Sequence, residues 1–147
     1  MIPRPGANGK GDYSAIEMKL IAVLERDFPE YRFKWGQKFA FQPPRTIKIG
    51  PRESNWRLLL LHEMGHAILR HKGFKTNIRR LKMEMEAWEK ARELAVKYKV
   101  KFDDDVVQEE LDTYRNWLHQ KSRCPKCGLT RFETPDGQYH CPQCENF

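Results

Sequence analysis

The chain has 147 residues, of which 39% are hydrophobic and 32% charged, with a formal net charge of +7. This length allows one compact domain with a small appendage. Its longest run of leucines, Leu58 to Leu61, is far shorter than the roughly 20 apolar residues that a membrane-spanning helix needs. The segment from Met1 to Gly6 has Pro and Gly where a signal peptide has its apolar stretch, so we expect a cytoplasmic protein with no membrane partner.

The positive charge is distributed unevenly along the chain. Residues 67–101 contain 11 Lys/Arg against 4 Asp/Glu, whereas residues 102–147 contain 5 against 9. A basic segment of this kind is typical of a surface that meets nucleic acid or an acidic substrate. The preferred interpretation is an ordinary solvated helix face, and the sequence leaves both interpretations open.

Local sequence patterns predict the first helix and the first strands. Residues 1–12 are rich in Gly and Pro, which predicts a flexible N-terminus. Ser14 and Glu17 have the spacing of a capping box, so a helix is expected over 14–27. Alternating apolar and polar residues at 31–35 and 46–49 predict two short strands.

Three further helices are expected over 54–70, 77–98 and 104–120. Ser54 is the predicted N-cap of the first of them. The acidic run from Asp103 to Asp105 suits the positive end of the last one. The predicted organisation is an α+β domain over residues 13–120, followed by a cysteine module over residues 121–147.

The segment His62-Glu63-Met64-Gly65-His66 carries the strongest catalytic signal. Histidines at positions i and i+4 lie about 40° apart around a helix, so both rings reach one metal ion. A catalytic zinc has three protein ligands and an open position for water. Glu63 flanks that position, where it takes a proton from the zinc-bound water and passes it to the leaving amine. The alternative is an ordinary amphipathic helix with two partly exposed histidines.

The third zinc ligand has three candidates. One face of the next predicted helix is apolar apart from a single carboxylate: Leu81, Glu84, Trp88, Ala91 and Ala95. A carboxylate that faces a core needs a partner, and a metal ion would supply one, so Glu84 is preferred. Glu86 lies on a charged face of the same helix. His71 follows His62 by nine residues, and it binds only if the helix ends before it. The small residues Ala87 and Ala91 would let the two helices pack closely.

The four cysteines form two Cys-x-x-Cys pairs near the C-terminus: Cys124, Cys127, Cys141 and Cys144. In a chain with no export signal this clustering favours metal over disulfides. Four thiolates make the closed tetrahedral shell of a structural zinc. The intervening residues suit a β-hairpin that turns at Pro135 to Gly137. We therefore expect two zinc ions per chain, one catalytic and one structural. The ribbon is expected to dock substrate, bind nucleic acid or cap the catalytic domain.

These features resemble a gluzincin metallopeptidase, most closely the ImmA/IrrE family. In that family an Arg and an apolar run precede a His-Glu-Leu-Gly-His motif, as Arg57 and four leucines precede the motif here. A following helix carries Glu-x-x-Ala-Asp/Asn, and this chain has Glu84-Met85-Glu86-Ala87-Trp88. The resemblance covers about residues 45–95. It implies a mainly helical zincin-like core and a cytosolic zinc endopeptidase, in several relatives one that cleaves a DNA-binding regulator.

The combination of the motif with a C-terminal zinc ribbon resembles, in second place, the SprT-like proteases. Their third zinc ligand is a later histidine that precedes a glycine. The nearest match here, His71-Lys72-Gly73, follows His66 too closely for that pattern.

Two functions follow from the sequence. The first is a zinc-dependent metallopeptidase (a hydrolase) acting on a cytosolic protein or peptide, with His62, His66 and Glu84 as ligands and Glu63 as general base. The second is a zinc-ribbon module that binds nucleic acid or protein, with an inactive or structural motif helix. Nucleic acid would then bind through residues 67–101 and the ribbon. Glu63 favours the enzyme. His71 and Tyr114 are candidates for stabilising the oxyanion.

Overall fold

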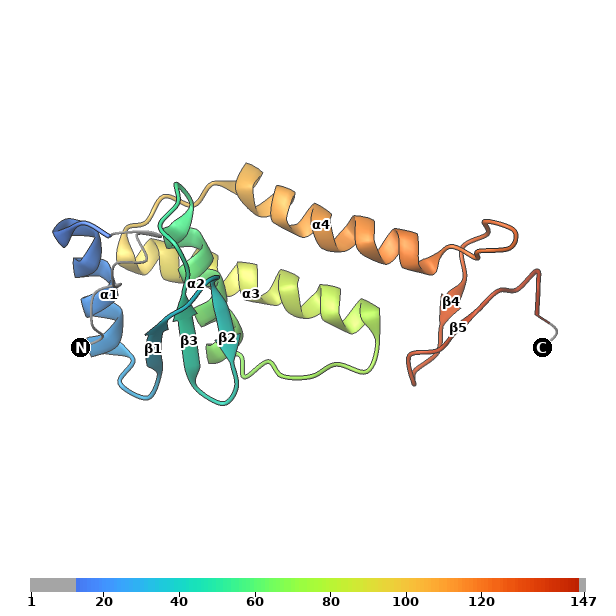
Figure 1. Cartoon of the computed structure of the whole chain (residues 1–147), viewed down its shortest axis with the longest axis horizontal. Coiled ribbons are helices and arrows are strands. Elements are labelled where there is room, and N and C mark those ends of the chain that lie inside the picture. Colours follow the sequence, from blue (N-terminus) through green and yellow to red (C-terminus); the bar gives the residue numbers. More distant parts are fainter. Residues whose placement is uncertain (1–12, 146–147) are drawn as a thin grey trace. The chain divides into compact units, whose positions relative to one another are not determined.

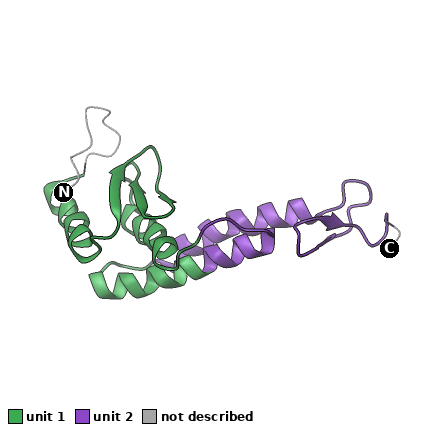
Figure 2. Cartoon of the chain, turned by 90° about the horizontal axis from the view of Figure 1, so that it is seen from below, with its two compact units in different colours: residues 1–71, 86–102 green, residues 72–85, 103–147 purple. Residues whose placement is uncertain are grey.

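The computed structural model describes residues 13–145, which form four helices and two small sheets (Figure 1). These residues divide into two compact units (Figure 2). One contains the chain up to His71 together with Glu86–Phe102, and the other contains Lys72–Met85 and the chain from Asp103. Helix α3 (Asn77–Tyr98) contributes to both. The α+β fold is confirmed, whereas the predicted flexible segment 1–12 lies outside the described residues.

Helix α1 (Ala15–Asp27) begins at the predicted capping box. The Ser14 hydroxyl accepts from the backbone N–H of Glu17 at 3.1 Å, and the Glu17 carboxylate accepts from the backbone N–H of Ser14 at 2.9 Å. These two bonds satisfy backbone donors that the first helical turn leaves unpaired. Ile21 and Leu24 bury the inner face of the helix.

A three-stranded sheet follows, formed by β1 (Arg32–Trp35), β2 (Ala40–Gln42) and β3 (Thr46–Ile49). Strand β3 lies in the middle, parallel to β1 and antiparallel to β2 (Figure 1). The sequence predicts β1 and β3 but not β2. With only three residues before Pro43, β2 is too short to show an alternating pattern, and its pairing with β3 defines it.

Helix α2 (Trp56–Ile68) contacts β2 and β3, and it is buried along most of its length. Its N-cap is Asn55, which makes no side-chain capping bond, so the prediction of Ser54 as N-cap is wrong. The helix start is instead anchored from α1, because the indole Nε1 of Trp56 donates to the Glu17 carboxylate at 3.2 Å. The buried positions are Trp56, Leu58, Leu60, Leu61, His62, Met64, Gly65 and Ala67.

The second unit contains the first turns of α3, helix α4 (Asp104–Ser122) and the ribbon. The Arg80 guanidinium lies over three aromatic rings at 4.9–5.4 Å from their centroids, those of Phe74, Tyr114 and Trp117. Such cation–π contacts hold α3 and α4 together within this unit. None of the helices in the described part of the chain is long and apolar enough to cross a membrane.

The ribbon hairpin consists of β4 (Phe132–Glu133) and β5 (Tyr139–His140), joined by the predicted turn, where Gly137 has a φ of +88°. Its Glu133 carboxylate accepts from the backbone N–H groups of Asn77 and Ile78 at 2.7 and 3.2 Å. The Asn77 side chain donates to the Tyr139 hydroxyl at 2.8 Å. The hairpin therefore caps the first turn of α3, a position where a carboxylate is favoured.

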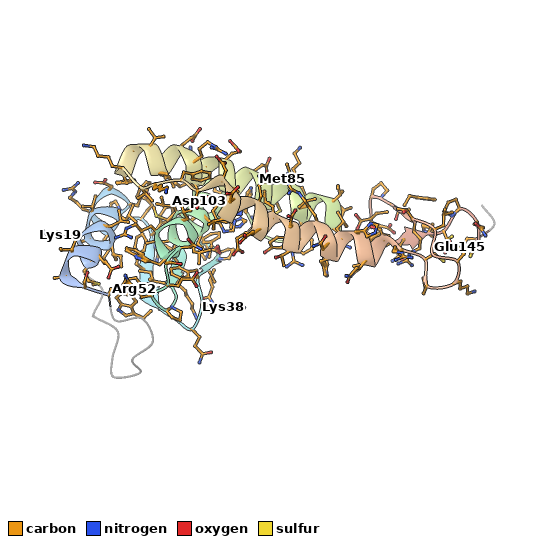
Figure 3. The ribbon with its side chains drawn as sticks, turned by 90° about the horizontal axis from the view of Figure 1, so that it is seen from above. Lys19, Lys38, Arg52, Met85, Asp103 and Glu145 are labelled. Atoms are coloured by element: carbon orange, nitrogen blue, oxygen red, sulfur yellow. The ribbon has the colours of Figure 1, made fainter. Side chains whose placement is uncertain are left out.

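Glu17 is expected to make the stability of the first unit depend on pH. A hydrogen bond from Arg52, in the segment between β3 and α2 (Figure 3), lowers the pKa of Glu17 from 4.5 to about 2. A carboxyl whose pKa is lower in the folded state than in the unfolded state stabilises the fold at a pH above its unfolded-state pKa. This stabilisation is lost as the pH falls through its folded-state pKa. Glu17→Gln should therefore lower the melting temperature at pH 7, with a difference from wild type that shrinks between pH 4.5 and 2.

Thermal unfolding followed by circular dichroism at a series of pH values measures this difference. Glu30→Gln, at an exposed position, is the matched control and should leave the melting temperature unchanged. An effect of Glu17→Gln that is the same at pH 7 and pH 2.5 would show that the charge of Glu17 does not contribute.

Candidate metal centres

The first candidate centre lies on α2. The ligand atoms of His62, Glu63 and His66 all lie within 4.8 Å of one another. The two imidazole rings are 4.7 Å apart between centroids and inclined by 63°. One helical turn separates the histidines, which brings both to one side of the helix. The structure thus assembles the three motif residues that the sequence predicts.

The donor set fits a metal ion such as zinc. Two imidazole nitrogens are typical zinc ligands, and a carboxylate beside them is available for a proton or for the metal. His62 and Glu63 are largely shielded from solvent, with the Glu63 carboxylate 3.4 Å from the His62 Nδ1. Shielding strengthens the electrostatic interactions that hold a cation.

Trp88 of α3 holds the His62 ring in place. The indole and the imidazole are stacked, with centroids 4.2 Å apart and planes only 9° from parallel. The indole is almost completely buried, so it restricts the rotation of the imidazole. The sequence places Trp88 on the apolar face of its helix but gives no sign of this contact, because the two residues are 26 positions apart.

Gly65 allows α2 and α3 to approach each other closely. A Cβ at position 65 would collide with the backbone carbonyl of Ala87. The small size of Ala87 predicts that the two helices approach closely. Gly65 is the residue of α2 that lies against Ala87. This packing brings Trp88, the next residue on α3, against His62.

Helix α2 ends before His71. This end is the condition that the sequence sets for His71 to reach the site. Arg70 has a φ of +57°, a left-handed conformation that costs a non-glycine residue about 1–2 kcal/mol. The backbone N–H of Arg70 donates to the carbonyl of Ala67 at 3.0 Å, and that of His71 to the carbonyl of His66 at 2.9 Å. These two bonds define a Schellman motif at the end of the helix.

At the end of α2, the side chain of His71 contacts those of His66 and Glu86. The Nδ1 atoms of His66 and His71 are 2.9 Å apart, and the Nε2 of His71 is 3.3 Å from the Glu86 carboxylate. His71 is only 8% exposed. The contact between Glu86 and His71 is not predicted by the sequence, since each is considered there only as a separate candidate ligand.

The third ligand stays a prediction. Glu84 is 8% exposed, as expected for a carboxylate on the apolar face of α3, and it belongs to the second unit. Tyr114, a sequence-based candidate for stabilising the oxyanion, also lies in the second unit, with its ring under Arg80.

The second candidate centre is the cysteine cluster of the ribbon. The sulfur atoms of Cys124 and Cys144 are 3.8 Å apart, and those of Cys127 and Cys141 are 3.6 Å apart. Zinc–sulfur bonds of about 2.3 Å in a tetrahedron place sulfurs about 3.8 Å apart, whereas a disulfide would join them at about 2.05 Å. The four thiols therefore have the arrangement of a zinc site and not of disulfides.

Backbone amides prepare this centre for a cation. Hydrogen bonds from the backbone N–H groups of Cys127 and Lys126 lower the pKa of Cys124 from 9.0 to about 6. In the second pair, the backbone N–H of Cys144 donates to the sulfur of Cys141 at 3.4 Å. At Cys124 these amides favour the thiolate, the form of cysteine that binds metal.

Comparisons with protein-family profiles, with curated proteins and with solved structures find no match to this chain. The likeness to ImmA/IrrE and SprT-like proteases therefore rests on the motif residues alone. Two groups of side chains that could hold a metal ion are the part of that likeness that the structure shows.

Metal analysis of the purified chain tests both centres at once. We expect two zinc ions per chain by elemental analysis. Replacing both His62 and His66 by Ala should remove one of them, and replacing both Cys124 and Cys141 by Ser should remove the other. A wild-type protein with a single zinc that only the cysteine variant loses would mean that the histidines hold no tightly bound metal.

Packing at Gly65 gives a second prediction. An alanine there gains about 1 kcal/mol in helix propensity but meets a backbone carbonyl that no side-chain rotation can relieve. Because such overpacking costs about 1–3 kcal/mol, Gly65→Ala should lower the free energy of unfolding and weaken metal binding at His62. Gly73→Ala is the control, since no atom lies within 4 Å of its added Cβ. Urea unfolding with equal stability of both variants would contradict this account.

Proposed function

We propose that this protein is a zinc-dependent metallopeptidase that hydrolyses peptide bonds of a cytosolic protein substrate. The observation that carries the proposal is the position of Glu63, whose carboxylate lies within 4.8 Å of the ligand atoms of two histidines. A structural zinc has four protein ligands and needs no adjacent base, whereas a hydrolytic site needs one.

Each residue has a defined part in this reaction. His62 and His66 hold the metal, and stacking on Trp88 keeps the His62 ring in its binding orientation. A zinc ion held by these two histidines would supply Lewis-acid activation of the attacking water and of the scissile carbonyl. Glu63 accepts a proton from the attacking water and delivers it to the departing amine nitrogen.

Glu63→Gln separates metal binding from catalysis. The amide keeps the size of the side chain but cannot accept the proton, so the rate of cleavage should fall by about 100- to 10,000-fold. Zinc content should equal that of wild type. Because the substrate is unidentified, the assay incubates the zinc-loaded protein with a library of cytosolic peptides and detects new termini by mass spectrometry.

The matched control is Glu53→Gln, at an exposed position before α2, which should cleave like wild type. Cleavage by Glu63→Gln at the wild-type rate would show that Glu63 is not the general base. New termini that appear equally with a protein lacking His62 and His66 would show that cleavage does not come from this site.

A second candidate function is binding of nucleic acid through the basic residues of segment 67–101 and the ribbon. Within Lys72–Met85 five basic residues stand against one acidic residue, Glu84. Phosphate contacts by such a segment predict binding to DNA or RNA that weakens steeply with salt and survives Glu63→Gln. Absence of binding at low salt would exclude this function, and its presence is compatible with a peptidase that meets its substrate on DNA.

A further inference from the structure

The Schellman motif at the end of α2 places one imidazole against another. In such a motif the residue two positions beyond the helix cap comes back over the last turn, and an apolar contact usually forms there. Here the residue beyond the cap is His71 and the residue it meets in the last turn is His66, and their Nδ1 atoms are 2.9 Å apart. The backbone of the helix end therefore dictates which side chain meets the metal-binding histidine.

The chemistry of Glu86 decides the direction of this hydrogen bond. A carboxylate only accepts hydrogen bonds, so the Nε2 of His71, 3.3 Å from it, carries the proton. A neutral imidazole protonated at Nε2 accepts at Nδ1. With His71 neutral, the Nδ1 of His66 is the donor, and Nε2 is then the nitrogen of His66 that offers a lone pair to a metal ion.

We propose that Glu86 and His71 are positioning residues that act through His66. They form a chain, carboxylate to imidazole to imidazole, that sets the protonated nitrogen and the ring orientation of this metal ligand. The inference rests on the proposed function, because it assigns these residues a part in the same site. It also assigns His71 a role other than that of third ligand.

The burial of the two residues suits this task. His71 is 8% exposed, so its bonds to His66 and Glu86 are little weakened by competing water. The Glu86 side chain is 38% exposed, so solvent reaches its carboxylate beside the contact with His71. Partners of this kind raise the basicity of a ligand histidine, and their loss typically weakens metal affinity about 10- to 100-fold.

Two substitutions of His71 distinguish a positioning residue from a ligand. The affinity of the full-length protein for zinc at the histidine site is measured by competition with a chelator. His71→Ala removes the acceptor, and affinity should fall about 10- to 100-fold. His71→Asn keeps an oxygen near the place of Nδ1 that accepts from His66 but is a poor zinc ligand, so it should restore most of the affinity.

A second pair of substitutions tests the carboxylate. Glu86→Gln retains an oxygen that accepts from His71 and should stay close to wild type, whereas Glu86→Ala should lose affinity. Glu89→Gln, an exposed position on the same helix, is the control for a change of charge and should have no effect. If the Glu86→Ala variant binds zinc as tightly as wild type, Glu86 does not act on His66 through His71, and the inference is wrong.

The protonation of His66 provides a readout that needs neither metal at the histidines nor activity. Long-range ¹H–¹⁵N NMR of the full-length protein, with zinc kept in the ribbon and removed from the histidines, identifies the protonated nitrogen. The proton should be on Nδ1 of His66 in wild type and shift toward Nε2 in His71→Ala. A wild-type proton on Nε2 overturns the inference, as does an affinity of His71→Asn as low as that of His71→Ala.

Failure of the proposed function would look different. A wild-type protein that binds no zinc at the histidines, or a Glu63→Gln variant that cleaves normally, would end the peptidase proposal. The position of the proton on His66 would still test the hydrogen-bonded chain by itself.

Discussion

The burial of α2 is the constraint on which the first unit depends. Eight of its 13 residues are buried. Strands β2 and β3 contact this helix, and the backbone carbonyl of Ala87 lies against Gly65. A polar group on the buried part of a helix needs a specific partner. The motif histidines are therefore placed by their surroundings as much as by their spacing along the helix.

Polar contacts at both ends of α2 meet this requirement. At its start, Glu17 serves the capping box of α1 and also accepts from Trp56 and Arg52. At its end, the left-handed Arg70 turns the chain so that His71 meets His66. Between them, the indole of Trp88 covers one face of His62. These contacts leave the candidate site with little freedom to rearrange, which is the condition for an effective metal centre.

The ribbon has a structural part in the second unit. A module of about 24 residues has too small a core to fold alone, so metal binding at its thiolates would supply the free energy. Its hairpin uses Glu133 and Tyr139 to cap the start of α3. These contacts stabilise the start of α3 within the second unit, whereas the role of the ribbon as a cap of a catalytic domain stays a prediction. Docking of a substrate and binding of nucleic acid stay predictions.

The sequence by itself determined what depends on neighbours along the chain. The capping box of α1 and the limits of α3 follow from local signals, and the histidine pair and each cysteine pair are brought together by one helical turn or one tight knuckle. The start of α2 does not follow from a local signal, since Ser54 is not its N-cap. Tertiary structure decided what depends on distant residues: the pairing of β2, the stacking of Trp88 on His62, and the contact between Glu86 and His71. Spacing encodes local geometry, but a contact across 26 positions depends on how whole helices pack, which no local pattern records.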